Sequence, residues 1–459
     1  MPLIIPANTL ASGGYAVDNS CRFDTNAGMN KTAANGTRTK ATFSTWIKRS
    51  NITAEQFLFV SYIDASNFIL FRFTGSEQLE MVNRVSASNI SFYTTNALYR
   101  DPSAFFHIVW SLDSTQGTAG NRIKLFVNGT QVTSFATSTT QDADTNFAAN
   151  VNTAEYYVAQ EYTSGYNYFN GYLAETVWID GLALAADQFG EFDEDSGIWK
   201  PIDVSGLTFG TSGFYLDYED SSNLGNDANG GTDLTENNLA AIDQSTDTCT
   251  NNFATMNPLD KIPIGSAITY SDGNLTTTAS AGSDWTTRYS FSTIAVSQGK
   301  WYVECKVGNV GAASQFYVGV IKNRQTTTFN TSLGYISNNG YGYYAASGNI
   351  VNNGSDLSTS GASYTTGDII GIALDLDNGT LDFYKNGSAQ GSQVTSLDTT
   401  ADWQFTNNAL QNAIWNWNFG SPSYSESGGE TDGNGYGNFA HAPPSGYFAL
   451  NTKNLAEYG

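Results

Sequence analysis

Basic residues, histidine and cysteine are all scarce in this chain of 459 residues. Its 20 Lys and Arg stand against 43 Asp and Glu, which gives a formal net charge of −23 at pH 7. Such a charge, with no basic cluster, repels the phosphates of nucleic acids and of anionic lipids. No apolar run approaches the roughly 20 residues of a membrane-spanning helix. We therefore expect no nucleic-acid partner and no membrane insertion.

The few cysteines and histidines exclude several kinds of site. Cys21, Cys249 and Cys305 are widely spaced and form no C-x-x-C pair, which indicates free thiols and not a disulfide framework. Together with His107 and His441 they provide no zinc-ligand spacing. The chain also has no G-x-S-x-G motif for a serine nucleophile. We expect that no cofactor is required.

Aromatic residues (14%) and 45 glycines are abundant, and many fall in or beside short alternating segments. In residues 106–112, Phe, Ile, Trp and Leu alternate with His, Val and Ser, and an Asn-Gly turn follows at 128–129. Residues 370–376 alternate in the same way, and a second Asn-Gly turn follows at 386–387. Alternation with Asn-Gly turns is typical of antiparallel hairpins. The sequence predicts an all-β fold with two antiparallel β-sandwiches in tandem.

Composition changes along the chain suggest four parts. Residues 1–205 form a first sandwich with an N-terminal segment. Residues 206–262 are rich in Asp, Asn and Gly and are interpreted as a connecting segment. Residues 263–425 form the second sandwich, and residues 426–459 a C-terminal tail that docks back on it.

Three motifs in the first half occur in the order found in a known family. They are ATFSTWIKRS at 41–50, FFHIVWSLDS followed by NRIKLFVNGTQV within 105–132, and YFNGYLAETVWIDGLAL at 168–184. This half resembles the laminin G/concanavalin A-like lectin family. The resemblance implies a jelly-roll sandwich and a role in recognition.

The second half carries a different set of motifs. GKWYVEC at 299–305, FYVGV at 316–320, LGY at 333–335, GDIIGIALDLDNGTLDFYKNG at 367–387 and WNFG at 417–420 resemble the SPRY family. That family implies a second sandwich, and more often the recognition of a protein.

Two further segments suggest the setting of these domains. TNNFATMNPLD at 250–260 and APPSGYFALNTKNL at 442–455 resemble proteins of tailed, especially marine, bacteriophages. The first residues lack the basic region of a secretory signal. We therefore expect a virion structural protein, assembled in a host cytoplasm and acting outside the cell as a tail fibre, an appendage or a head decoration.

Two aromatic-rich segments are candidates for ligand binding. A tyrosine ring matches the apolar face of a sugar, and neighbouring polar groups match its hydroxyls. Packing within or on the sheets is the alternative role for each ring. The candidate residues are Tyr162, Tyr166, Tyr168, Tyr341, Tyr343 and Tyr344.

An acidic cluster is a candidate calcium site. Asp217, Asp220, Asp227 and Asp233 lie within 17 positions, among Gly, Asn and Ser. Hard oxygen ligands on a flexible loop suit Ca²⁺. A solvated acidic linker is the alternative interpretation, since the EF-hand spacing is absent.

A concanavalin A-like fold can also carry a glycosidase, which needs two carboxylates on one wall. Glu175 and Asp180 are five positions apart, so regular alternation places them on opposite faces. Asp217 and Glu219 open the acidic cluster, where a turn or a cation site is the more natural role. The sequence therefore predicts a non-enzymatic protein.

The expected partners are other virion proteins and a host-surface glycan or protein. Multiple copies would strengthen weak contacts, and a tail fibre would imply a homotrimer, although no coiled-coil heptads specify one. Three alternatives remain: a purely structural virion protein without a host ligand, a glycan-degrading enzyme, and a bacterial surface adhesin that would need an export route.

Overall fold

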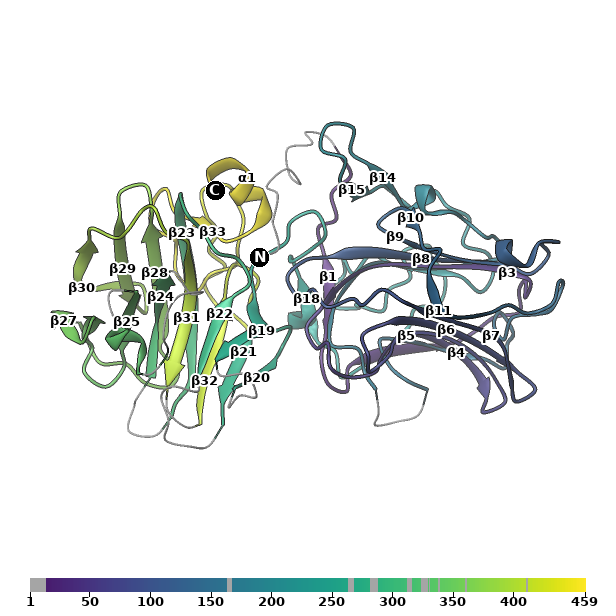
Figure 1. Ribbon diagram of the computed structural model, residues 1–459, viewed down its shortest axis with the longest axis horizontal. Helices are drawn as coiled ribbons and strands as arrows, with labels where there is room; N and C mark the ends of the chain where they lie inside the picture. The colour runs from purple at the N-terminus through teal and green to yellow at the C-terminus, as the bar shows by residue number, and fades with distance from the viewer. Residues whose placement is uncertain are drawn as a thin grey trace. The chain divides into compact units, whose positions relative to one another are not determined.

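The computed structural model describes residues 14–162, 167–262, 268–280, 288–311, 316–322, 329, 331–336, 339–359, 361–409 and 412–459. The described residues form two compact units, 14–251 and 252–459 (Figure 1). Each unit contains two antiparallel sheets packed over an apolar core. The predicted all-β fold with two sandwiches in tandem is confirmed.

The first sheet of the first unit contains the closing strand of the lectin-like motifs, β13, next to β3. Its strand order is β10 (Thr130–Gln131), β9 (Ile123–Val127), β8 (Phe106–Asp113), β3 (Lys40–Arg49), β13 (Gly171–Asp180), β1 (Ser20–Phe23) and β18 (Gln244–Ser245), with β16 (Phe214–Leu216) also paired to β13. A hairpin and three short turns complete this part: β14 (Gly190–Phe192), β15 (Trp199–Pro201), η2 (Ala119–Asn121), η3 (Ala186–Gln188) and η4 (Ala241–Asp243).

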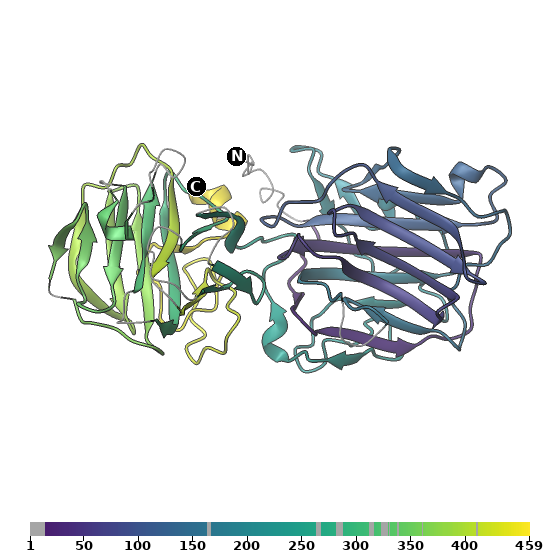
Figure 2. The ribbon, with the colours of Figure 1, turned by 60° about the horizontal axis from the view of Figure 1, so that its bottom comes forward.

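The second sheet of the first unit is a run of antiparallel strands (Figure 2). Its order is β11 (Phe135–Thr139), β7 (Ser88–Thr95), β6 (Leu79–Val85), β5 (Asn67–Phe73), β4 (Gln56–Asp64), β12 (Glu155–Val158), β2 (Gly28–Thr32) and β17 (Thr235–Asn237).

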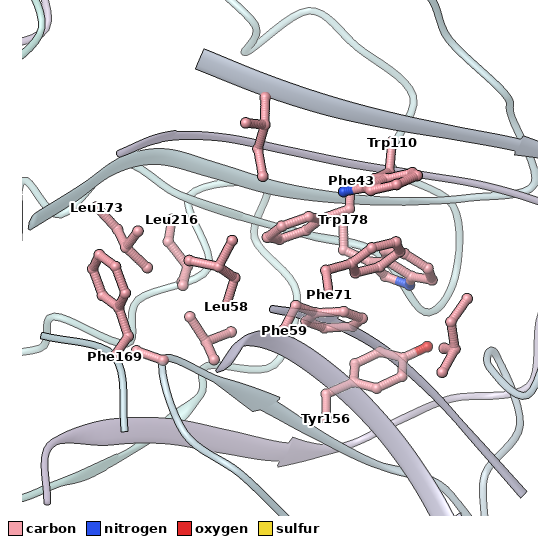
Figure 3. Close-up of a cluster of buried hydrophobic side chains, with 14 of the residues drawn as sticks. Phe43, Leu58, Phe59, Phe71, Trp110, Tyr156, Phe169, Leu173, Trp178 and Leu216 are labelled. Carbon is pink, nitrogen blue, oxygen red and sulfur yellow. The ribbon is translucent and has the colours of Figure 1, made fainter. Parts of the chain in front are cut away.

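Large aromatic rings fill the space between these two sheets (Figure 3). The Phe43 ring stacks on Phe71 with 5.1 Å between centroids, and Phe59 stacks on Trp178 at 4.7 Å. The Trp178 indole N–H donates to the Asn150 side-chain oxygen at 3.0 Å, so its polar edge is satisfied inside the core. The many aromatic residues of the sequence thus supply the large side chains that fill the core between the two sheets.

The second unit repeats the plan. One sheet has the order β19 (Met256–Ile262), β22 (Tyr289–Ser292), β31 (Trp403–Ala409), β24 (Phe316–Lys322), β25 (Gly340–Tyr344), β26 (Ile350–Asn352) and β27 (Ser355–Ser358). The other has the order β20 (Ile268–Ser271), β21 (Thr276–Ala279), β32 (Ala413–Asn418), β23 (Lys300–Val310), β28 (Ile369–Asp375), β29 (Thr380–Lys385) and β30 (Ser388–Thr395). The turn η8 (Leu333–Tyr335), the short strand β33 (Phe448–Ala449) and the helix α1 (Thr452–Tyr458) complete it.

Both predicted Asn-Gly turns are confirmed. Asn128 and Gly129 join β9 to β10 with φ values of 45° and 74°, and Asn386 and Gly387 join β29 to β30 with 48° and 77°. Positive φ at both central residues is the geometry of a type I′ turn, whose twist matches that of the flanking strands.

Of the segment 206–262, which the sequence analysis interprets as a connection, residues 206–251 belong to the first unit. They add β16, β17 and β18 to the two sheets of that unit. Two buried ion pairs hold them, Lys31–Asp227 at 3.3 Å and Lys48–Asp247 at 2.7 Å. Strands β16, β17 and β18 are too short to show an alternating pattern in the sequence, and long-range polar contacts fix them in place.

The C-terminal segment at 426–459 folds onto β23. Strand β33 pairs with it in parallel, through Trp301 opposite Phe448. The buried Glu304 carboxylate of β23 accepts the backbone N–H groups of Ala440 and His441 at 2.8 and 3.0 Å. No helix in the described part of the chain has the length and hydropathy that crossing a membrane requires.

Candidate functional site

The outer face of the second sheet of the first unit, which points away from the core, carries a row of aromatic and charged side chains. Tyr62 of β4 lies opposite Phe68 of β5, and Phe68 lies opposite Arg84 of β6. Directly opposed residues of antiparallel strands share a face. Phe68 belongs to a cluster separate from the core, which fixes this row on the outer side. Glu155 of β12 and Asn89 of β7 extend the row at its two ends.

A second row, parallel to the first, forms an apolar floor. Val60 is opposite both Tyr157 and Leu70, and Val82 follows opposite Leu70. Phe92 of β7 closes the row opposite Val82. Val60, Leu70 and Val82 are buried, while Tyr157 and Phe92 remain partly exposed.

The third row is polar, and its arginine is paired with acids. Arg72 of β5 lies opposite Glu80 of β6 and donates from Nε to its Oε1 at 2.7 Å. Arg72 also donates to Glu55 at 2.8 Å. Thr94 of β7 donates to the second oxygen of Glu80 at 3.0 Å. The guanidinium of Arg72 is therefore fully engaged by two carboxylates.

Tyr162 covers one end of this face. Its ring stacks on Tyr62, with 4.2 Å between centroids and 8° between planes, and lies 5.7 Å from the Phe68 ring. Both tyrosines are partly exposed. Burial raises the pKa of Tyr162, so the phenol keeps its proton at neutral pH. We call Tyr62, Phe68, Arg84 and Tyr162 together the tyrosine platform.

The other tyrosine candidates of the first unit contribute less. Tyr168 is partly exposed, just before the buried Phe169. Tyr166 lies outside the described residues. Tyr62, which the sequence reasoning missed, becomes a candidate because its partner ring arrives from a loop 100 positions away, a contact that periodicity does not predict.

The three candidates of the second unit separate onto two faces. The segment that carries them is strand β25, so successive side chains alternate. Tyr343 is fully buried between Tyr364 and Phe383, with ring centroids at 4.7 and 5.5 Å. Its side chain therefore has no exposed surface in this structure. Tyr341 packs against the same core, while Tyr344 stacks on Tyr317 at 4.5 Å on the outer side and stays partly exposed.

The four aspartates of the proposed calcium site are used locally. Asp217 accepts the backbone N–H of Glu219, and Asp220 that of Ser222. Asp227 is buried against Lys31, and Asp233 accepts the N–H of Asp227 at 3.1 Å. Within the described ranges, no three Asp, Glu, His or Cys side chains are placed to hold a metal ion. Calcium binding by this segment stays a prediction.

His107 is buried and hydrogen-bonded to Ser44 and Trp199. This arrangement resembles a catalytic Ser–His pair, but the ring nitrogen that faces Ser44 carries a proton and cannot act as the base. The Trp199 indole N–H donates to its Nδ1 at 3.1 Å, and its Nε2 lies 2.8 Å from the Ser44 hydroxyl. Because Nδ1 accepts, a neutral ring carries its proton on Nε2 and donates it to Ser44. Burial lowers the pKa of His107 to about 3, which keeps the ring neutral. It cannot take a proton from Ser44 in this state, and it serves to fix the β14–β15 hairpin to the first sheet.

Glu175 and Asp180 do lie on opposite faces, although the strand is not regular. A bulge between Ala174 and Val177 breaks the alternation of β13, and Glu175 has φ +49°. Its carboxyl accepts the Tyr215 hydroxyl at 2.8 Å on the outer side, and burial raises its pKa to about 8. Asp180 instead accepts the backbone N–H of Thr37 at 2.7 Å. The two carboxyl groups therefore do not form an acid–base pair.

Comparison with protein families assigns the two sandwiches. Residues 23–188 match the family model described as the concanavalin A-like lectin/glucanases superfamily. Residues 300–406 match the SPRY domain model. The chain carries a concanavalin A-like domain and a SPRY domain in tandem. Domains of these kinds suggest recognition or binding. The tyrosine platform lies on the concanavalin A-like domain.

Several solved structures are similar to parts of the chain at low sequence identity. The SPRY domain of human HERC1 is 19% identical and covers 35% of this chain and 96% of its own, with a TM-score of 0.30. A putative carbohydrate binding protein from Bacteroides ovatus is 13% identical and covers 48% and 58%, with a TM-score of 0.35. A pentraxin from Limulus polyphemus is 13% identical and covers 38% and 80%, with a TM-score of 0.29. A search of curated proteins finds no match.

Proposed function

We propose that this protein is a non-enzymatic virion component of a tailed bacteriophage that binds a glycan of the host surface. The observation that carries the glycan-binding part is the stack of Tyr62 and Tyr162 on an outer sheet face. A sugar ring offers one apolar face and a belt of hydroxyl groups. The partly exposed tyrosine rings match the apolar face of the sugar, and the polar side chains at both ends of the row match its hydroxyl groups.

Polar groups flank the rings at both ends of their row. Glu155 lies opposite Tyr62, and Arg84 and Asn89 lie beyond Phe68. Such groups orient a sugar by hydrogen bonds, while the rings supply contact area. Few contacts of this kind per site give weak binding, which many copies on one particle would strengthen.

The virion assignment is supported by the sequence segments at 250–260 and 442–455, whose resemblance is to tailed-phage proteins. On this proposal the protein stands on the particle exterior, as a tail fibre, an appendage or a head decoration. The SPRY domain provides a second recognition surface, toward the host or toward another virion protein.

Binding to immobilised bacterial lipopolysaccharide and capsular polysaccharide tests the proposal directly. Purified full-length protein should bind at least one of them at micromolar concentration without releasing reducing ends. Gold-labelled antibody against the protein should decorate the outside of intact particles. Absence of binding would favour a purely structural role, and release of reducing ends would show an enzyme.

A further inference from the structure

We infer that the tyrosine platform prefers glycans that carry a carboxylate, and that Arg84 receives this group. The inference rests on the proposed glycan binding and specifies its ligand class. It starts from a difference between the two arginines of the same face. Arg72 is bound by Glu55 and Glu80, with its Nη1 2.8 Å from Glu55 and its Nε 2.7 Å from Glu80. Arg84 has no such partner.

The guanidinium of Arg84 makes few hydrogen bonds compared with that of Arg72. Its Nη1 lies 3.4 Å from the side-chain oxygen of Asn89, a long hydrogen bond. Its Nε is buried and has no hydrogen-bond partner. The cation lies 5.9 Å from the centre of the Phe68 ring, which steadies it at the sheet surface. Among the described residues, no carboxylate forms an ion pair with Arg84.

Two acids of β12 and β4 are already engaged by residues near them. Both carboxylate oxygens of Glu155 accept hydrogen bonds from β2, from Asn30 at 2.7 Å and Thr32 at 2.9 Å. Asp64 accepts the Ser66 N–H and the Asn67 amide in its own turn. These groups leave Arg84 as a cation without a counter-ion on a chain of net charge −23.

The geometry of the row suits a carboxylated sugar chain. Tyr62 and Arg84 are separated by the strand of Phe68, that is by two inter-strand spacings of about 4.8 Å each. A sugar ring on the tyrosines can therefore extend a carboxylate along the row to Arg84. A guanidinium binds a carboxylate through two parallel hydrogen bonds, which an ammonium group cannot reproduce. The matching ligand is a polymer of uronic acids or another carboxylated sugar.

Three acidic polymers provide the test: hyaluronate, polygalacturonate and alginate, each compared with its carboxyl-reduced counterpart. Reduction keeps the sugar ring and removes the charge. We measure the dissociation constant of the full-length protein for each polymer at about 0.15 M salt, where repulsion from the acidic chain is screened within about 8 Å. At least one acidic polymer should bind about tenfold more tightly than its reduced form, the size of one charge-assisted contact.

Variants separate the inference from the proposed function. Arg84→Gln should remove the preference, so that the acidic and the reduced forms bind with equal affinity. Arg84→Lys should restore only part of the preference. Lys124→Gln, on the first sheet, changes the net charge equally and should change nothing. Tyr162→Ala should weaken both forms.

Each remaining outcome decides one of the two proposals. Equal binding of acidic and reduced forms by the wild type would overturn the inference and leave glycan binding intact. An acid preference that survives Arg84→Gln would overturn the role of Arg84. Failure of the wild type to bind any of the polymers would overturn the inference, and the panel of bacterial polysaccharides then decides the proposed function separately.

Discussion

Glu304 shows how one buried side chain can make a whole segment sensitive to pH. Its carboxyl accepts two backbone N–H groups of the C-terminal segment and the Tyr302 hydroxyl, at 2.8 to 3.1 Å. Burial nevertheless dominates and raises the pKa of Glu304 to about 7. A carboxyl whose pKa is raised on folding binds its proton more strongly in the folded state. Its stabilising contribution is therefore complete below pH 4.5 and is lost as pH rises through 7.

We predict that Glu304→Gln flattens this part of the stability profile. The wild-type SPRY domain should lose on the order of 2 to 3 kcal/mol of unfolding free energy between pH 5 and pH 8 from this group alone. Urea unfolding of the full chain across this range measures the loss. Glu175→Gln serves as a comparison in the other unit. An unchanged profile in Glu304→Gln would show that the group is not protonated in the folded state.

Lys48 and Asp247 illustrate the cost of separating a buried ion pair. Their side chains are 1% and 2% exposed, and Nζ lies 2.7 Å from Oδ2. Asp247→Ala leaves a buried ammonium without its carboxylate and should cost about 3 to 5 kcal/mol. Glu191→Ala removes an exposed partner of Lys200 and should cost about 0 to 1 kcal/mol. Similar losses in both variants, measured by denaturant unfolding, would contradict this account.

At the scale of elements, turns and strands were predictable where the pattern is local. Alternation in residues 106–112 predicts β8, and the Asn-Gly turns at 128–129 and 386–387 predict two hairpins. The 206–251 segment was not assigned to the first sandwich, because its short strands depend on partners more than 30 positions away. Strand β25 was not predicted, because the glycines around Tyr343 interrupt the alternation. The tyrosine platform was missed in part for a different reason. Strand register, and not sequence order, brings Tyr62, Phe68 and Arg84 together.

The β9–β10 turn offers a test of close packing at an element end. Gly129 has φ +74°, and a Cβ there would lie 2.3 Å from the Trp199 ring. Gly230 has a similar φ of +79°, but a Cβ there would meet nothing within 4 Å. Gly230→Ala should therefore cost only the backbone strain of about 1 to 2 kcal/mol. Gly129→Ala should cost more, because the Trp199 ring must also move. Equal unfolding free energies for the two variants would show that the ring gives way freely.

At the scale of the whole molecule, composition and fold explain each other. Scarce charge, many aromatics and many glycines fit two sandwiches whose strands are joined by tight turns. Much of the acidity serves structure, since aspartates close turns and pair with buried lysines. The outer face of the concanavalin A-like domain combines partly exposed tyrosine rings with an arginine that lacks a counter-ion, and this carries our proposal of glycan recognition.

The affinity of the full chain for its best-bound polysaccharide, compared between wild type and two tyrosine variants, tests this claim most directly. Tyr162→Ala removes half of the stacked pair and should weaken binding by about tenfold, or about 1.4 kcal/mol. Tyr344→Ala removes a similar exposed ring from the SPRY domain and should leave the affinity within about twofold, a change of less than 1 kcal/mol. Circular dichroism confirms that each variant is folded. Wild-type affinity in Tyr162→Ala would contradict the account.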